Sequence, residues 1–220
     1  QGVWVFGPAA DGNTTLYNAA LKGPAAIVIG SEGGFSVSEA EKAVAAGAKN
    51  VTHTYNAQSA LHHREIGVVG SAMLVDELNC ELIADTIHVS VPAMRLLVKN
   101  KNAEKISLIT DAMRAKGIPD GESELGGQKV FVKNGEARLA DGTLAGSVLR
   151  MNKAIENIVT KVGVPFEQAV DYATINPARL LGIDNEAGSI KVGKRADFTV
   201  LNDKYEVILT IRGGEVIYKA

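Results

Sequence analysis

The chain has a single cysteine, Cys80, few aromatic residues and no long apolar run. One cysteine excludes an internal disulfide, so we expect a protein of a reducing compartment, the cytoplasm. A helix that crosses a bilayer needs about 18 or more apolar residues in succession, and the sequence contains no such run and no signal-peptide pattern. These absences argue against membrane-spanning proteins and disulfide-stabilised secreted proteins.

An excess of positive charge is also missing. Lys and Arg together number 23 and Asp and Glu 25, which gives a net charge of −2 and a pI near 6.1. Proteins that bind nucleic acids or anionic membranes rely on a positive field. We therefore expect neither nucleic acid nor a membrane among the partners. Hydrophobic residues are plentiful, at 46% of 220 residues, and suffice for a sizeable core.

Short apolar runs that end in polar residues recur along the first half of the chain. We expect strands in these runs, at 3–6, 25–29, just before His53, 80–85 and 105–110. Helical patterns lie between them. Ser36 and Glu39 have the spacing of a capping box for a helix that Gly47 ends, and a second helix should cover 92–100. This alternation predicts an α/β fold with a parallel sheet and helical crossovers.

The alternation breaks at 113–146, where Asn134-Gly135 predicts a tight hairpin because these residues accept positive φ. Three helices should follow, the first capped by Ser147, the second beginning at Pro165, and the third opened by Asn176-Pro177 and closed by Gly182. Strands are expected in the tail at 196–201, 205–211 and 215–218.

Polar residues at the ends of three apolar runs are the strongest functional signal. His53, His88 and Asp111 each follow such a run. Active sites of α/β barrels lie at the carboxyl ends of their strands, and His and Asp together suit a divalent metal and a general base. The structural alternative is that the histidines only form hydrogen bonds and that Asp111 only caps a helix.

Several motifs, in order, carry a family resemblance. They are Thr52-His53 with Asn56-Ala57, His62-His63-Arg64-Glu65 with Gly67-Val68-Val69-Gly70, Ile83-Ala84-Asp85 with Ile87-His88, Ile109-Thr110-Asp111-Ala112-Met113, Asp141-Gly142-Thr143-Leu144-Ala145-Gly146-Ser147, Asn176-Pro177-Ala178 and Gly188-Ser189-Ile190 with Gly193-Lys194 and Ala196-Asp197. With these motifs, residues 37–220 resemble the N-acetylglucosamine-6-phosphate deacetylases of the amidohydrolase superfamily.

The resemblance implies a partial (β/α)8 barrel of the TIM type. Residues 1–182 would form the C-terminal half of this barrel, with 1–35 of uncertain origin, and 183–220 would supply strands of a small β-sandwich domain. A half barrel leaves strand edges unpaired. We therefore expect either a homo-oligomer or a chain that lacks an N-terminal half.

The resemblance also implies a reaction. It is the metal-dependent hydrolysis of the acetamide of N-acetylglucosamine 6-phosphate, which releases glucosamine 6-phosphate and acetate in amino-sugar catabolism. His53 would ligate a divalent metal ion, with zinc expected first and iron, manganese or cobalt open. Asp111 would act as the catalytic base and then as the acid, while His88 would be the second catalytic residue and polarise the amide carbonyl.

The phosphorylated amino sugar would be held by four residues. They are Asn56, the backbone of Ala57, Arg64 and His88, with Arg64 on the phosphate because its planar fork matches phosphate oxygens. The alternative for Arg64 is a surface pair with Glu65. His62 and His63 are interpreted as loop residues, Glu81 and Asp85 as supporting or solvated carboxylates, and Lys194 and Arg195 as members of a solvated turn.

The sequence departs from the family in its metal ligands. The family has a Gly-His-Ser type motif where this chain has Gly30-Ser31-Glu32-Gly33-Gly34, and no histidine precedes His53. The upstream glutamate ligand of the family is missing as well, and Glu32 is the one nearby carboxylate that could replace it. An inactive or incomplete remnant that still binds sugar phosphates is therefore the alternative hypothesis.

Residues 1–35 resemble a different family. Trp4-Val5-Phe6-Gly7, Asp11-Gly12, Leu16-Tyr17 and the stretch 23–33 are similar to the cofactor loop of SPOUT-class RNA 2′-O-methyltransferases. The resemblance implies a fragment of an S-adenosylmethionine-dependent enzyme, which is a further alternative. A glycine turn after a buried strand is a weak motif by itself.

Overall fold

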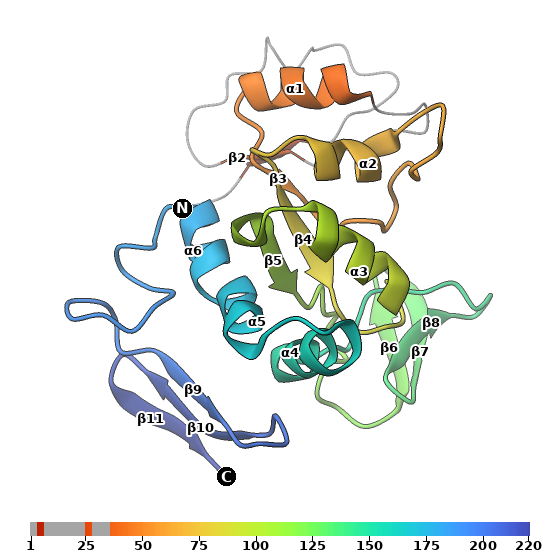
Figure 1. Ribbon diagram of the computed structural model, residues 1–220. Helices are drawn as coiled ribbons and strands as arrows, with labels where there is room; N and C mark the ends of the chain where they lie inside the picture. Colours follow the sequence, from red (N-terminus) through yellow and green to blue (C-terminus); the bar gives the residue numbers. More distant parts are fainter. Residues whose placement is uncertain (1–3, 7–24, 28–35) are drawn as a thin grey trace.

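The computed structural model describes residues 4–6, 25–27 and 36–220 of the protein, and a parallel sheet lies at its centre (Figure 1). This sheet has the order β3 (Asn50–Val51), β4 (Asn79–Ile83) and β5 (Ile106–Ile109). All pairs are parallel, and helices α2 (Gly67–Leu74) and α3 (Val91–Asn100) connect the strands. The predicted parallel sheet with helical crossovers is confirmed.

One face of the sheet is covered by a layer of helices. The helices are α3, α4 (Met151–Asn157), the π-helix Ile158–Val162 and α5 (Phe166–Ala173), which pack on the sheet in one hydrophobic core (Figure 1). Successive side chains of a strand point to opposite faces. On β4, Cys80 and Leu82 belong to the core, while Asn79 and Glu81 hold polar partners on the other face.

Helix α2 was not predicted. All its residues from Gly67 to Met73 are buried, so it shows no polar face and no helical periodicity in the sequence. By contrast, α1 (Val37–Ala45) begins with the predicted capping box, in which Ser36 and Glu39 bond each other's backbone. Its C-terminal end passes into Gly47 at φ 101°.

A second sheet, antiparallel, follows β5. It consists of β6 (Gly121–Leu125), β7 (Gln128–Lys133) and β8 (Glu136–Leu139). The hairpin between β7 and β8 turns at Asn134 and Gly135, whose φ values of 53° and 81° confirm the predicted turn. Strand β6 was not predicted, because its residues are mostly exposed and include only one large apolar side chain, Leu125.

The helix cap predicted at Ser147 is wrong. Helix α4 begins only at Met151, and Ser147 is used elsewhere. Its hydroxyl donates to the Thr110 carbonyl, and its backbone bridges Ala112 in a parallel pairing. Ser147 therefore pairs with the chain that follows β5 and does not cap a helix.

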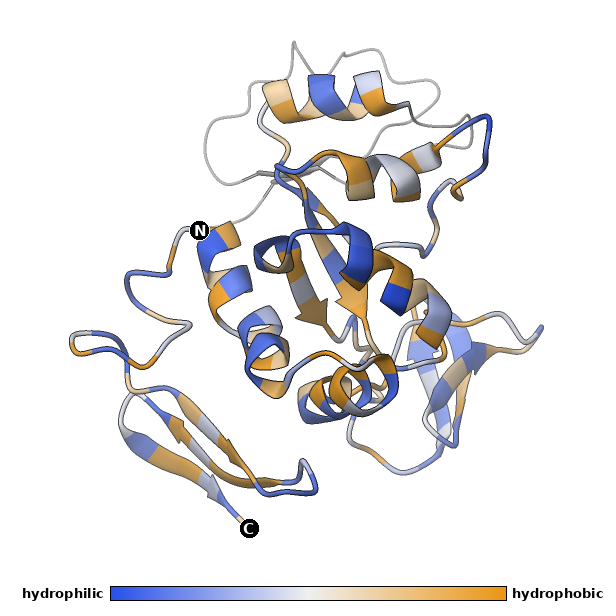
Figure 2. Cartoon of the chain, in the orientation of Figure 1, coloured by the Kyte–Doolittle hydropathy of each residue, from blue (hydrophilic) through white to orange (hydrophobic). Residues whose placement is uncertain are grey.

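The last part of the chain begins with α6 (Ile175–Leu181), closed as predicted by Gly182 in a left-handed conformation. Strands β9 (Phe198–Leu201), β10 (Val207–Arg212) and β11 (Glu215–Lys219) then form an antiparallel sheet, as predicted for the tail. Figure 2 shows apolar residues spread along these strands, none of which is buried. The described strands do not close into a barrel.

At the other end of the chain, β1 (Trp4–Phe6) pairs in parallel with β2 (Ala25–Ile27), within the runs predicted as strands. The glycine turn at 30–34, with Glu32, lies outside the described residues. Among the helices that the structure describes, none has the length and apolar character needed to cross a membrane.

Candidate functional site

The polar segments predicted to carry function follow β3, β4 and β5 at their carboxyl ends. Because these strands are parallel neighbours, their ends lie along one edge of the sheet. The backbone N–H of Thr54 donates to the Glu81 carbonyl at 2.8 Å, which places the segment after β3 beside β4. His53, His88 and Asp111 therefore lie along the same edge, as the sequence predicts.

The backbone at this edge is strained. Positive φ is uncommon for residues other than glycine and concentrates at functional sites. Among the described residues seven non-glycine positions have it, and five belong to these segments: His53 (33°), Tyr55 (83°), Ala57 (51°), Thr86 (68°) and Asp111 (45°). Four of these five are residues that the sequence assigned to catalysis, metal binding or substrate binding, or are direct neighbours of one, and Thr86 lies two positions before His88.

His53 is held by a turn of its own segment. Its Nδ1 lies 3.0 Å from the carbonyl oxygen of Asn56. A carbonyl only accepts hydrogen bonds, so Nδ1 carries the proton and Nε2 of the neutral ring keeps its lone pair. This tautomer is the one a metal ligand needs at Nε2. The Asn56 amide in turn donates to the carbonyls of His53 and Thr54, at 3.3 and 3.4 Å.

Two further side chains brace the segment. Gln58 donates to the Thr52 carbonyl at 2.8 Å and accepts from the Tyr55 N–H at 3.0 Å. The Tyr55 hydroxyl donates to the Ala93 carbonyl at 2.6 Å, and burial raises the pKa of this hydroxyl to about 12. The loop is thus tied to helix α3 by a phenol that stays protonated at neutral pH.

A carboxylate holds His88. Asp85 Oδ2 lies 2.6 Å from His88 Nδ1, and the two side chains are only 8% and 10% exposed. Burial alone would raise the pKa of Asp85, but hydrogen bonds from the His88 ring and from the backbone of Ile87 and His88 outweigh it and lower the pKa. The interpretation of Asp85 as a supporting carboxylate fits these contacts, and the spacing Asp-x-x-His could have suggested His88 as its partner.

Glu81 supports β3 from the polar face of the sheet. Its carboxylate accepts from Asn50 and Thr52, both at 2.8 Å. Asn79 and Ser107 continue this row of hydrogen bonds across the sheet. The interpretation of Glu81 as a supporting carboxylate fits these contacts.

Asp111 has an exposed side chain at the end of β5. Its backbone carbonyl accepts from the Ser147 N–H at 3.1 Å, and no helix begins after it. The alternative that Asp111 only caps a helix is therefore wrong. Its carboxylate is placed where a substrate could reach it.

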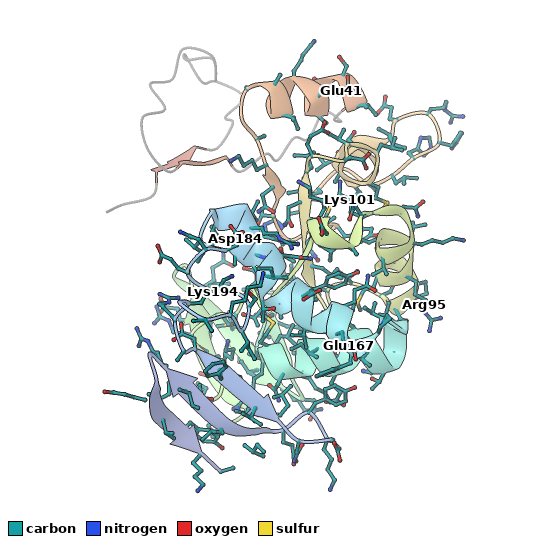
Figure 3. The ribbon with its side chains drawn as sticks, turned by 60° about the vertical axis from the view of Figure 1, so that its left-hand side comes forward. Glu41, Arg95, Lys101, Glu167, Asp184 and Lys194 are labelled. Carbon is teal, nitrogen blue, oxygen red and sulfur yellow. The ribbon has the colours of Figure 1, made fainter. Side chains whose placement is uncertain are left out.

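Arg64 lies in an exposed loop between β3 and α2. Its guanidinium contacts His63 Nε2 at 2.6 Å, and no ion pair with Glu65 is formed. Its assignment to the substrate phosphate stays a prediction. The turn interpreted as solvated is largely exposed, Arg195 included, and Lys194 in it is half-buried. The Lys194 Nζ donates to the Ser189 hydroxyl at 2.7 Å and to the carbonyls of Asp184 and Ala187 (Figure 3).

The described residues do not complete a metal site. Within 4–6, 25–27 and 36–220, no group of three or more His, Cys, Asp or Glu side chains is placed to share a metal ion. His53 is suited to be one ligand, because Nε2 of its ring keeps a lone pair while Nδ1 carries the proton.

Comparison with known proteins decides the family. A protein-family profile described as "Amidohydrolase family" matches residues 21–217. The chain belongs to the amidohydrolase family. This match begins inside the segment 1–35, and the methyltransferase resemblance of that segment finds no support in the comparisons. Most of that segment lies outside the described residues.

The relatives are named as deacetylases of 6-phosphorylated N-acetyl amino sugars, with either glucosamine or galactosamine as the sugar. The chain is 44% identical to the N-acetylglucosamine-6-phosphate deacetylase of Bacillus subtilis, over 80% of this chain and 44% of that protein. It is also 44% identical to a putative N-acetylgalactosamine-6-phosphate deacetylase of Escherichia coli K12, over 70% of this chain and 92% of that protein. The crystal structure of the Thermotoga maritima N-acetylglucosamine-6-phosphate deacetylase matches with a TM-score of 0.80 and 37% identity, over 88% of this chain and 53% of that one. The chain thus spans about half the length of the first and third of these proteins.

Proposed function

We propose that this amidohydrolase chain acts in the hydrolysis of the acetamide of N-acetylglucosamine 6-phosphate, giving glucosamine 6-phosphate and acetate. One observation carries the proposal: His53, His88 and Asp111 follow three neighbouring parallel strands along a strained edge, in a chain with relatives named N-acetylglucosamine-6-phosphate deacetylase. Its place would be amino-sugar catabolism in the cytoplasm.

Asp111 is proposed as the group that moves the proton. As a carboxylate it takes a proton from the attacking water, and as a carboxylic acid it returns that proton to the leaving amine. Its exposed position at the end of β5 allows both transfers. His88 Nε2 is the ring atom left over for the substrate, because Nδ1 is bonded to Asp85.

Asn56, the backbone of Ala57 and Arg64 are proposed to bind the sugar phosphate together with His88. The side-chain NH₂ group of Asn56 already donates to carbonyls of its own turn, so the side-chain oxygen is the atom available to the sugar. Arg64 sits on an exposed loop, where its guanidinium can turn from His63 toward a phosphate.

A divalent metal ion, zinc or else iron, manganese or cobalt, would be ligated by His53 together with groups outside the described residues. Such an ion supplies a nucleophilic hydroxide at neutral pH and polarises the carbonyl. These further ligands would come from a longer chain or from a second copy. There the partial barrel 1–182 would be completed to a TIM-type barrel, and the strands 183–220 to a β-sandwich.

The alternative is a remnant that binds sugar phosphates without hydrolysing them. The lack of a three-ligand cluster among the described residues favours it. Retained binding of N-acetylglucosamine 6-phosphate with neither metal nor turnover would be its signature.

The test measures acetate release from N-acetylglucosamine 6-phosphate and its galactosamine epimer, together with metal content of the purified protein. We expect bound metal, turnover of at least one epimer, and loss of that turnover in Asp111→Asn but not in Asp203→Asn. Asp203 is an exposed turn residue far along the chain from the site, and makes a matched control. Bound metal without any turnover would contradict the proposal.

A further inference from the structure

The segment between β4 and α3 is built around one carboxylate. Asp85 Oδ1 accepts from the backbone N–H groups of Ile87 and His88, both at 2.8 Å, and Oδ2 meets His88 Nδ1 at 2.6 Å. Three N–H groups thus converge on one side chain. The short N···O distance to the ring is typical of a charge-assisted hydrogen bond.

These bonds fix the imidazole in one orientation. A carboxylate that already accepts two backbone hydrogen bonds is ionised and can only accept from the ring. His88 Nδ1 must therefore carry a proton, and Nε2 is the only ring nitrogen left to face the substrate. Because the carboxylate and the ring are both largely buried, water competes weakly for this bond.

The backbone around the pair is held as well. Thr86, between Asp85 and His88, has a φ of 68°, a conformation that a β-branched residue avoids. The carbonyl of Ala84, just before Asp85, accepts from the buried amide of Asn157 on α4 at 2.9 Å. The strained loop is thus anchored at its start by a helix and closed by the carboxylate.

We propose that Asp85 is a positioning residue, which holds His88 with Nδ1 protonated so that Nε2 alone faces the substrate. The inference rests on the proposed function, since it assigns Asp85 a part in the same hydrolysis. Asp85 itself does not touch the substrate and acts through the ring of His88.

Asp85→Asn tests this role with little change of shape. The amide oxygen can still accept from the two backbone N–H groups, while the NH₂ group now faces Nδ1. Two donors cannot pair, so the neutral ring must shift its proton to Nε2. The equivalent exchange in the triad of serine proteases, which also leaves the histidine in the wrong tautomer, lowers kcat by roughly 10⁴-fold.

The experiment records ¹⁵N–¹H spectra of the histidine rings in the native chain, Asp85→Asn and the control Asp203→Asn. His88→Gln assigns the His88 signals. We expect a protonated Nδ1 in the native chain and in the control, and the Nε2-protonated tautomer in Asp85→Asn. In acetate release, kcat should fall on the order of 10² to 10⁴-fold in Asp85→Asn, with a smaller change in KM.

A native spectrum with an unprotonated Nδ1 of His88 would overturn the inference. This measurement does not depend on the folding of any variant. So would Asp85→Asn with native kcat and native ring signals. A native chain without turnover would refute the proposed function alone, and the ring spectra would then decide the role of Asp85 by themselves.

Discussion

At the scale of single residues, the ionisable side chains of Lys101 and Asp85 are largely buried and are held by hydrogen bonds. Lys101 is 4% exposed, and its Nζ donates to the carbonyls of Ala72 and Val75 at 2.8 and 2.6 Å (Figure 3). Burial lowers the pKa of this ammonium. Its charge lies at the C-terminal end of α2, where the helix dipole is negative and unpaired carbonyls need donors.

We predict that Lys101→Met destabilises the fold by about 1–3 kcal/mol, because the carbonyls of Ala72 and Val75 lose their charged donor. They keep only the Cys80 thiol and the Leu78 N–H as donors. The measurement is urea unfolding followed by circular dichroism. Lys99→Met, at an exposed position in the last turn of α3 just before Lys101, is the control and should change stability by no more than about 0.5 kcal/mol. Equal effects of the two substitutions would contradict the capping role of Lys101.

Asp85 should make stability depend on acid pH. Its pKa is lowered from 3.8 in the folded state, so its contribution is fully present above the unfolded value and is lost as pH falls through the folded value. The stability difference between the native chain and Asp85→Asn should therefore be largest above about pH 4 and shrink below it. Denaturant unfolding at a series of pH values measures this, and a difference that grows on acidification would be inconsistent with it.

At the scale of elements, the entry into α2 depends on a glycine. Gly67 has a φ of 66°, and a Cβ there would lie 2.5 Å from the carbonyl oxygens of Ser59 and Ala60. The loop that carries Arg64 therefore packs directly on the start of the helix. This close approach links the predicted substrate-binding loop to the buried helix.

We predict that Gly67→Ala destabilises the protein by more than Gly47→Ala. Both positions have positive φ, but a Cβ at Gly47 would meet open space. Backbone strain alone should cost about 1–2 kcal/mol at Gly47, and the clash with backbone should add to this at Gly67. Thermal unfolding of both variants measures the difference, and the same loss in each would show that the close approach is unimportant.

At the scale of the whole molecule, one core joins the parallel sheet to its helix layer, and Cys80 lies in its middle. Burial raises the pKa of the Cys80 thiol to about 11, with Lys101 acting in the opposite direction. The thiol is also fully buried. Thiolate, the reactive form, is therefore scarce and inaccessible in the folded state.

Cys80 should consequently report global unfolding. At pH 8 we expect no reaction with a thiol reagent in the native chain and one thiol per chain in denaturant, with a labelling midpoint equal to that of circular dichroism. Since the sequence has one cysteine, no second thiol confuses the result. Rapid labelling of the native protein would contradict a tightly packed core.

Local chemistry made much of this fold predictable. Only a few residues predict the local conformation at the capping box of Ser36, the Asn134-Gly135 turn and the helix end at Gly182. Helix α2 and strand β6 lack such signals, because one is buried all round and the other mostly exposed. Ser147 was misassigned because its partner, the edge beside β5, is distant in the sequence.

The candidate site, like the fold, could be predicted from the sequence only in part. His53, His88 and Asp111 could be picked out because each follows an apolar run, and parallel pairing then brings the strand ends together. The contact of His53 with the Asn56 carbonyl and the left-handed backbone of Tyr55 and Thr86 could not, because they depend on how each loop folds back on itself.

The proposed role of Asp111 is decided by acetate release from N-acetylglucosamine 6-phosphate, measured with the metal-supplemented native chain and with Asp111→Asn. Asparagine tolerates the φ of 45° at this position, so the variant should keep the fold. We expect turnover in the native chain and a loss on the order of 10² to 10⁴-fold in kcat for Asp111→Asn, with KM little changed. Equal turnover in the two proteins would contradict it.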